Sequence, residues 1–263
     1  MQESPGAELV ELMGTFAFDC IWACCLEHRA IEPKEIYSLI QACRLSGKDA
    51  IIRVKPKNNT EVLWLLESGA RGIMLPRVLG LEDVQEVVAA MKFPPLGRRG
   101  YDGLHADAGF GRTSPAEFLA KANNETFLIA QIEDVEVLPQ IDALAALPGV
   151  DILFVGPADL SLSLGRHGDM ENPKLQAVIR QVAAACRKHG KVAGIPATTS
   201  QIAGYHALGY RFFNVLTTQK CVVEGLKRTC ADLQALPFLH AGQSAESATT
   251  PIASSPLCLR IES

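Results

Sequence analysis

The sequence lacks three features that would mark a membrane, secreted or nucleic-acid-binding protein. It has no run of about 20 consecutive apolar residues, the length that a membrane-spanning helix needs. Its start, MQESPGAELVELMG, has no basic segment followed by an apolar one. Basic residues are not in excess, since 25 Lys and Arg face 29 Asp and Glu. We therefore expect a cytoplasmic protein with a small-molecule substrate, and neither membrane nor nucleic acid among its partners.

Cysteine and glycine motifs are missing as well. The eight cysteines form no C-x-x-C pair and no metal-knuckle spacing, and several lie within apolar runs. This usage is typical of free thiols in a reducing compartment rather than of a disulfide framework. No G-x-G-x-x-G follows an apolar run, which disfavours a dinucleotide-binding fold.

What the chain does have is a regular alternation of short apolar runs and amphipathic stretches. Such runs are typical of parallel strands buried on both faces, and the alternation indicates βαβ units. The predicted strands are 19–26, 50–54, 72–75, 127–132, 151–155, 191–194 and 211–215. The predicted helices are 5–13, 33–45, 60–68, 81–91, 115–123, 135–147, 173–188, 200–208 and 219–236.

Polar residues at the strand ends favour a barrel over a doubly wound sheet, because barrel active sites draw on the carboxyl ends of many strands. These residues are Glu27, His28, Arg53, Arg77, Glu133, Asp159 and Thr198. A barrel needs eight strands, yet only seven runs are found, and a helix precedes the first of them. We therefore predict an α/β fold, a TIM-type (β/α)₈ barrel that lacks its first strand.

The barrel is expected to span residues 1–236. Residues 237–263 are rich in Ser, Thr, Ala and Pro and predict a poorly ordered tail that chemistry does not need. Residues 94–114 are rich in Gly and charge and are too long for an ordinary connection. We expect this segment to be a functional loop over the barrel mouth.

Two carboxylates follow neighbouring strands. Glu133 closes the 127–132 run, and Asp159 comes shortly after the next run. Adjacent parallel strands lie about 4.8 Å apart, so both side chains can converge on one ion. Oxygen ligands without Cys or His suit Mg²⁺ or Mn²⁺ better than zinc. The alternatives are a solvated strand end for Glu133 and a helix N-cap for Asp159.

Arg53 and His28 are the other candidate site residues. Arg53 ends an apolar strand, where a lone guanidinium needs an anionic partner. That partner is either a substrate carboxylate, held bidentately, or Glu67 in a structural ion pair. His28 follows the first run and is a candidate base, with an ordinary loop histidine as the alternative.

Six segments taken together resemble the HpcH/HpaI aldolase family, the metal-dependent pyruvate aldolases of the phosphoenolpyruvate/pyruvate barrel superfamily. They are LEH (26–28), IRV (52–54), GIMLPRV (72–78), FPPLGRRG (93–100), QIED (131–134) and GVDILFVGPADLSLSLG (149–165). The resemblance implies a lyase that reversibly cleaves 2-keto-4-hydroxy acids, such as 2-keto-3-deoxy sugar acids, to pyruvate and an aldehyde.

The resemblance also implies roles for individual residues. It makes Glu133 and Asp159 ligands of Mg²⁺ or Mn²⁺, Arg53 the residue that holds the pyruvyl group, and His28 a base that acts through water. Gln131 and Ala158 then contact the substrate. It further implies a homo-oligomer, such as a hexamer, assembled through a C-terminal helix.

This chain departs from the family at two positions beside His28. Cys25 replaces the aspartate that usually orients the histidine, and Arg29 stands where small residues are usual, which favours a more anionic aldehyde. Two other functions stay open. One is a decarboxylase or a malyl- or citryl-thioester-type lyase of the same superfamily, and the other is a degenerate paralogue without catalysis.

Overall fold

The computed structural model describes residues 6–28 and 30–236. Its core is one parallel sheet of seven strands that follow one another in chain order, so every connection is a βα crossover. This arrangement confirms the predicted barrel-type α/β fold. The strands are β1 (Cys20–Cys25), β2 (Asp49–Arg53), β3 (Gly72–Leu75), β4 (Phe127–Ile132), β5 (Ile152–Val155), β6 (Val192–Pro196) and β7 (Tyr210–Asn214).

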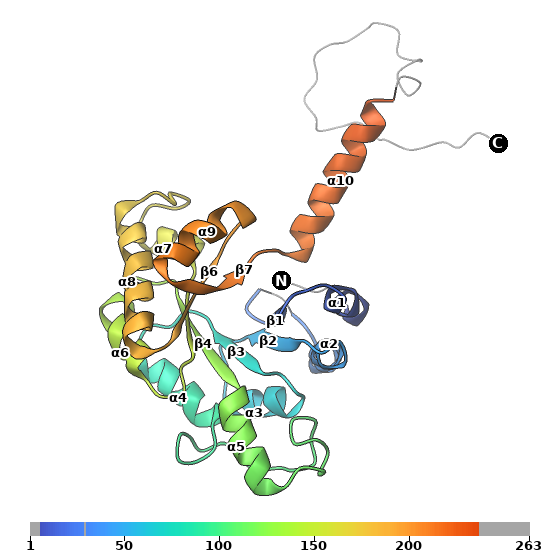
Figure 1. Ribbon diagram of the computed structural model, residues 1–263, viewed down its shortest axis with the longest axis vertical. Helices are drawn as coiled ribbons and strands as arrows, with labels where there is room; N and C mark the ends of the chain where they lie inside the picture. The colour runs from blue at the N-terminus through green and yellow to red at the C-terminus, as the bar shows by residue number, and fades with distance from the viewer. Residues whose placement is uncertain (1–5, 29, 237–263) are drawn as a thin grey trace, which may run out of the picture. The chain divides into compact units, whose positions relative to one another are not determined.

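Helices alternate with the strands, and those of the first compact unit, which ends at Gln219, lie around the curled sheet (Figure 1). Among the described residues, none of the helices combines the length and the apolar character that crossing a bilayer requires. The helices are α1 (Ala7–Gly14), α2 (Pro33–Leu45), α3 (Asn59–Glu67), α4 (Leu81–Met91), α5 (Pro115–Glu125), α6 (Ile141–Ala146), α7 (Pro157–Ser163), α8 (Pro173–His189), α9 (Thr199–Leu208) and α10 (Thr218–Gln234).

Side chains alternate between the two faces of the sheet, so each strand contributes residues to two hydrophobic clusters. Alternate strand residues join the helices in a large outer cluster that includes Ile52, Ile73 and Leu153. The residues between them form a smaller inner cluster of Trp22, Ile51, Met74, Ile129, Ile152 and Phe154. This inner cluster fills the sheet's concave side, and the next inward position toward the carboxyl ends is polar on two strands, at Arg53 and Gln131. The alternation therefore places these polar side chains on top of an apolar floor.

The sheet has open edges at β1 and β7 in the described part of the chain, as a missing strand predicts. Helix α1 comes before β1 and packs against α2, and no strand precedes it among the described residues. An apolar groove of about 280 Å³ lies between the edges and is lined by residues of both, among them Phe18, Trp22, Phe212 and Phe213.

Three predictions about helices and loops need correction. The short helix α7 is absent from the predicted helices. The predicted helix 135–147 is a 3₁₀ turn at Leu138–Gln140 followed by α6, because Pro139 cannot donate a helical hydrogen bond. The 94–114 loop does not cover the strands' carboxyl ends. It joins α4 to α5, and the Ala106 N–H donates to the Glu67 carbonyl at the end of α3.

Most of helix α10 belongs to a second compact unit, which begins at Lys220. Its exposed apolar side chains are Val222, Val223, Leu226 and Leu233. Residues 237–263 lie outside the described residues, so the predicted tail and the 1–236 domain boundary stay predictions. Five described cysteines are free, of which Cys43 and Cys186 are buried, whereas Cys221 and Cys230 are exposed.

Candidate active site

Arg53 and Glu133 meet at the carboxyl ends of β2 and β4, although 80 residues separate them in the chain. Each is only 2% exposed. The Arg53 Nε donates to Oε1 of Gln131 at 2.9 Å, and its Nη2 lies 3.4 Å from Oε1 of Glu133. A buried guanidinium needs anionic or polar partners, and the three side chains supply them to one another. The sequence-predicted residues Arg53, Gln131 and Glu133 are therefore brought together.

Glu27 extends this cluster toward solvent. Its Oε2 accepts from Arg53 at 2.8 Å, and its Oε1 accepts from the Nε of Arg77 at 2.5 Å. Burial alone would raise the pKa of Glu27, but the hydrogen bond from Arg77 and the charge of Arg53 lower it. Glu67, the alternative partner for Arg53, instead lies 3.7 Å from His105. The ion pair predicted between Arg53 and Glu67 is therefore wrong, and Glu27 takes that place.

The two oxygens of Glu133 have different surroundings. Oε1 accepts the backbone N–H of Arg77 at 2.7 Å, whereas Oε2 is buried without a hydrogen-bond partner. Burial raises the pKa of Glu133, against the effect of the Arg77 N–H and the charge of Arg53. A buried carboxylate oxygen left without a donor is costly unless a cation completes its surroundings. This oxygen therefore fits the predicted metal-ligand role.

Space beside that oxygen is kept by Gly156, the N-cap of α7. A Cβ at Gly156 would come within 2.9 Å of Oε2 of Glu133 and of Nε2 of Gln131. Asp159 follows in the first turn of α7, and its charge raises the pKa values of both Glu133 and Arg77. The N-cap alternative for Asp159 is wrong, since Gly156 occupies that position. The carboxylates of Glu133, with its unpartnered Oε2, and of Asp159 suit a hard divalent ion that keeps coordination sites for water and substrate.

The described residues contain no group of three or more His, Cys, Asp or Glu side chains able to enclose a metal ion. A pair of carboxylates falls below that number, so a cation here would be completed by water and substrate oxygens. Such open coordination is what a catalytic Mg²⁺ or Mn²⁺ site requires, and a closed structural site is not expected.

His28 lies at the edge of the cluster. Its side chain is 49% exposed, and its Nε2 is 3.8 Å from Oε2 of Glu27, too far for a hydrogen bond. The side chain of Cys25 lies outside the described part of the structure, as does Arg29. Glu27 is thus the carboxylate that the structure places beside His28. Ala158 is exposed at the second position of α7, next to Asp159.

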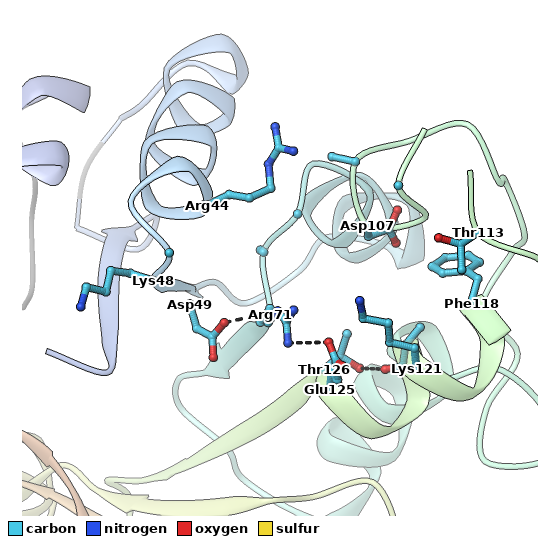
Figure 2. Close-up of a pocket in the computed structure, with 16 residues that line it drawn as sticks. Arg44, Lys48, Asp49, Arg71, Asp107, Thr113, Phe118, Lys121, Glu125 and Thr126 are labelled. Carbon is cyan, nitrogen blue, oxygen red and sulfur yellow. Dashed lines mark hydrogen bonds and ion pairs between the residues drawn. The ribbon is translucent and has the colours of Figure 1, made fainter. Parts of the chain in front are cut away.

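A cavity of about 320 Å³ lies at the other end of the sheet, where β2, β3 and β4 begin (Figure 2). Arg71 crosses its floor, pairing with Asp49 at 3.3 Å and with Glu125 at 2.6 Å. The 94–114 loop contributes Asp107 to its wall. None of the sequence-predicted site residues lines this cavity, so its size does not make it the catalytic centre.

Lys92 is a buried lysine, a kind of residue that can form a Schiff base with a keto acid. Burial lowers the pKa of Lys92. However, its Nζ donates to the carbonyls of Asn123 and Thr126, at 2.9 and 2.5 Å, and to the Thr126 hydroxyl at 3.2 Å. These bonds fasten α4 to the start of β4, at the end of the sheet opposite Glu133. Lys92 is therefore structural.

Comparison with known proteins identifies the family of this chain. A family model described as HpcH/HpaI aldolase/citrate lyase matches residues 27–223. The chain belongs to this family. In this HpcH/HpaI protein, Arg53, Gln131 and Glu133 meet at the strand ends, Glu27 and Arg77 contact them, and His28 lies beside Glu27.

Relatives of this HpcH/HpaI protein are named aldolases. A 2-dehydro-3,6-dideoxy-6-sulfogluconate aldolase of Pseudomonas putida is 32% identical over 80% of this chain and 81% of its own length. A 2-keto-3-deoxy-L-rhamnonate aldolase of Klebsiella pneumoniae is 33% identical over 67% of this chain and 66% of its own. The predicted family and aldolase function are therefore confirmed.

A solved structure agrees with the fold. The HpcH/HpaI aldolase of Desulfitobacterium hafniense superposes with a TM-score of 0.84 at 28% identity, covering 90% of this chain and 92% of that one. The match covers most of both chains, so the barrel-type fold of the present chain is that of a solved HpcH/HpaI aldolase.

Proposed function

We propose that this protein is a divalent-metal-dependent aldolase that reversibly cleaves a 2-keto-4-hydroxy acid, such as a 2-keto-3-deoxy sugar acid, to pyruvate and an aldehyde. The observation that supports it most is the convergence of a buried guanidinium and an unpartnered buried carboxylate oxygen at the carboxyl ends of β2 and β4. The named aldolases among the relatives support the same reaction class.

Arg53 binds the pyruvyl carboxylate in this proposal. Its guanidinium is already held in plane by Gln131 and Glu27, so it loses little freedom when substrate arrives. Its positive charge also offsets the negative charge that develops on the keto oxygen when the carbon–carbon bond breaks. Gln131 and the backbone around Ala158 complete the walls of the substrate site.

His28 moves the proton in the proposed reaction. In the cleavage direction it accepts the proton of the 4-hydroxyl group, directly or through water. The C3–C4 bond then breaks, its electron pair passes to C3 and the keto group, and the aldehyde departs. A proton delivered to C3 completes pyruvate, and the reverse sequence makes the bond. Exposure of His28 to solvent leaves room for a relay water.

Glu133 and Asp159 would hold the divalent ion. When bound, Mg²⁺ or Mn²⁺ acts as a Lewis acid that stabilises negative charge on the keto oxygen. The choice between the two ions is part of the proposal. Gly156 and the free Oε2 of Glu133 keep the position open to an oxygen-ligated cation.

Pyruvate alone tests the proposed function. In D₂O with Mg²⁺ or Mn²⁺, we expect the protein to replace the C3 protons of pyruvate with deuterium, seen as loss of the methyl signal by ¹H NMR. EDTA should stop the exchange, and added metal should restore it. Exchange that survives EDTA would refute the metal requirement. No exchange under any condition would favour the non-catalytic paralogue.

A second carbon–carbon lyase reaction shares the same chemistry. The family model includes citrate lyases, and a decarboxylase or thioester lyase would pass through the same enolate. Adding an aldehyde separates the reactions, because an aldolase consumes pyruvate and aldehyde together. Loss of oxaloacetate without any aldehyde reaction would instead identify a decarboxylase.

We further propose that the protein acts in the cytoplasm as a homo-oligomer, such as a hexamer. Its free cysteines fit a reducing compartment. The exposed apolar side chains of α10, Val222 and Leu226 among them, fit a surface that another subunit covers.

A further inference from the structure

Arg77 carries hydrogen-bond donors that the cluster does not use. It follows β3 after Pro76, and its side chain is 52% exposed. Its Nε donates to Glu27, but among the described residues neither terminal amino group of its guanidinium makes a hydrogen bond. Four N–H donors therefore face the space outside the carboxyl ends of the strands.

The backbone at Arg77 is held in an unusual conformation. Its φ is +48°, in the left-handed region that non-glycine residues rarely adopt. This geometry directs the backbone N–H to Oε1 of Glu133, at 2.7 Å, and leaves the side chain over Glu27. A strained residue that touches the proposed metal ligand points to a role in the site rather than to an ordinary surface arginine.

Glu27 lies between a buried and an exposed arginine. Oε2 of Glu27 contacts buried Arg53 and lies 3.8 Å from His28, whereas Oε1 contacts exposed Arg77. A substrate with its pyruvyl end on Arg53 and its 4-hydroxyl near His28 must extend its remaining carbons outward. Those carbons belong to the aldehyde half, and Arg77 is the exposed cation that contacts the same carboxylate as Arg53.

Lys55 adds a second positive charge at this rim. It follows β2 by two residues, and its Nζ lies 3.5 Å from the carbonyl of Arg77. Glu27, the carboxylate beside Arg77, already shares its charge with Arg53. Arg77 and Lys55 thus bring two exposed positive charges to this rim, to which an anionic ligand can bind.

We propose that Arg77, supported by Lys55, forms an anion subsite that selects aldehydes bearing a carboxylate. This inference rests on the proposed aldolase function. A planar guanidinium with two free amino groups matches the two oxygens of a carboxylate. Arg29, the residue that the sequence linked to an anionic aldehyde, lies outside the described residues, and Arg77 carries the assignment.

Arg77→Gln tests the subsite. Aldol addition of pyruvate is measured with succinic semialdehyde and with butanal, which have equal chain lengths and differ in the terminal carboxylate. We expect the ratio of kcat/KM for the anionic aldehyde to that for the neutral one to fall about tenfold or more, since charge-assisted hydrogen bonds are lost. Glutamine keeps a polar side chain and the backbone N–H to Glu133.

Arg71→Gln is the matched control. Arg71 lies just before the other end of β3, is 41% exposed and is ion-paired with Asp49 and Glu125. Its substitution should leave the ratio unchanged. An unchanged ratio in Arg77→Gln, or an equal loss with both aldehydes, would overturn the subsite. If wild-type protein exchanges pyruvate protons while the ratio does not respond, only the subsite fails. Absence of that exchange in the wild type would refute the aldolase function itself.

Discussion

Replacing Glu133 with glutamine is expected to lower the kcat of metal-dependent pyruvate exchange by about 10³-fold or more. Glutamine preserves the volume of the side chain and can still accept the N–H of Arg77, so the backbone has no reason to move. It removes the negative charge that would hold the cation. Initial rates at saturating Mn²⁺, compared with wild type, give the measurement.

Stability should not account for that loss. Burial raises the pKa of Glu133, which means that the fold disfavours its charged form. A neutral amide relieves this cost, so we expect the melting temperature of Glu133→Gln to equal or exceed that of wild type. Asp142→Asn, an exposed carboxylate change beside Lys188, should keep full activity. Near-normal exchange by Glu133→Gln would remove this residue from the mechanism.

Replacing Arg53 with lysine is expected to reduce kcat/KM for pyruvate exchange by about 10²-fold or more. The guanidinium donates through Nε to Gln131 and through Nη2 to Glu27 at the same time. An ammonium is a point charge without that planar fork and cannot fix the plane of a carboxylate. Steady-state exchange rates over a range of pyruvate concentrations measure the effect.

A structural role for Arg53 would give a different result. Lysine keeps a positive charge beside the buried Glu133, which avoids most of the penalty of an unpaired buried carboxylate. If Arg53 only supported the fold, Arg53→Lys would lower the melting temperature and leave the KM for pyruvate unchanged. We expect instead a raised KM in a protein that stays folded at the assay temperature.

The strands could be predicted from sequence because buried parallel strands are continuous apolar runs. The 127–132 run matches β4, and 72–75 matches β3. The described residues likewise hold seven strands, and a helix precedes the first of them, as the pattern predicts. Helix α7 could not be predicted because it has only seven residues and starts at a Gly156-Pro157 step, which is typical of a turn.

The 94–114 loop was misplaced for a topological reason. A long glycine-rich connection after a strand would extend over the barrel mouth, but this one follows α4, which returns the chain to the strands' amino ends. Its Phe110 ring lies 5.6 Å from the guanidinium carbon of Arg44, near the C-terminus of α2. The composition of residues 94–114 indicated a functional loop, but it did not show at which end of the sheet the loop lies.

The site was predicted only in part. The sequence indicated Arg53 as a site residue because its charge ends an apolar run, and the pairing of Glu133 with Asp159 stays a prediction from neighbouring strands. The contacts of Glu27 could not be foreseen, since they need the carboxyl ends of β1, β2 and β3 to converge. Arg77 was visible as a strand-end residue, but its positive φ and its hydrogen bond to Glu133 depend on the folded chain.

Titration with Mn²⁺, followed by electron paramagnetic resonance of the free ion, tests most directly whether Glu133 and Asp159 share one cation. Wild-type protein and Asp142→Asn should bind one Mn²⁺ per chain with equal affinity. Glu133→Gln and Asp159→Asn should each weaken binding about tenfold or more, because each removes one of two charged ligands. Wild-type affinity in Asp159→Asn would contradict the account.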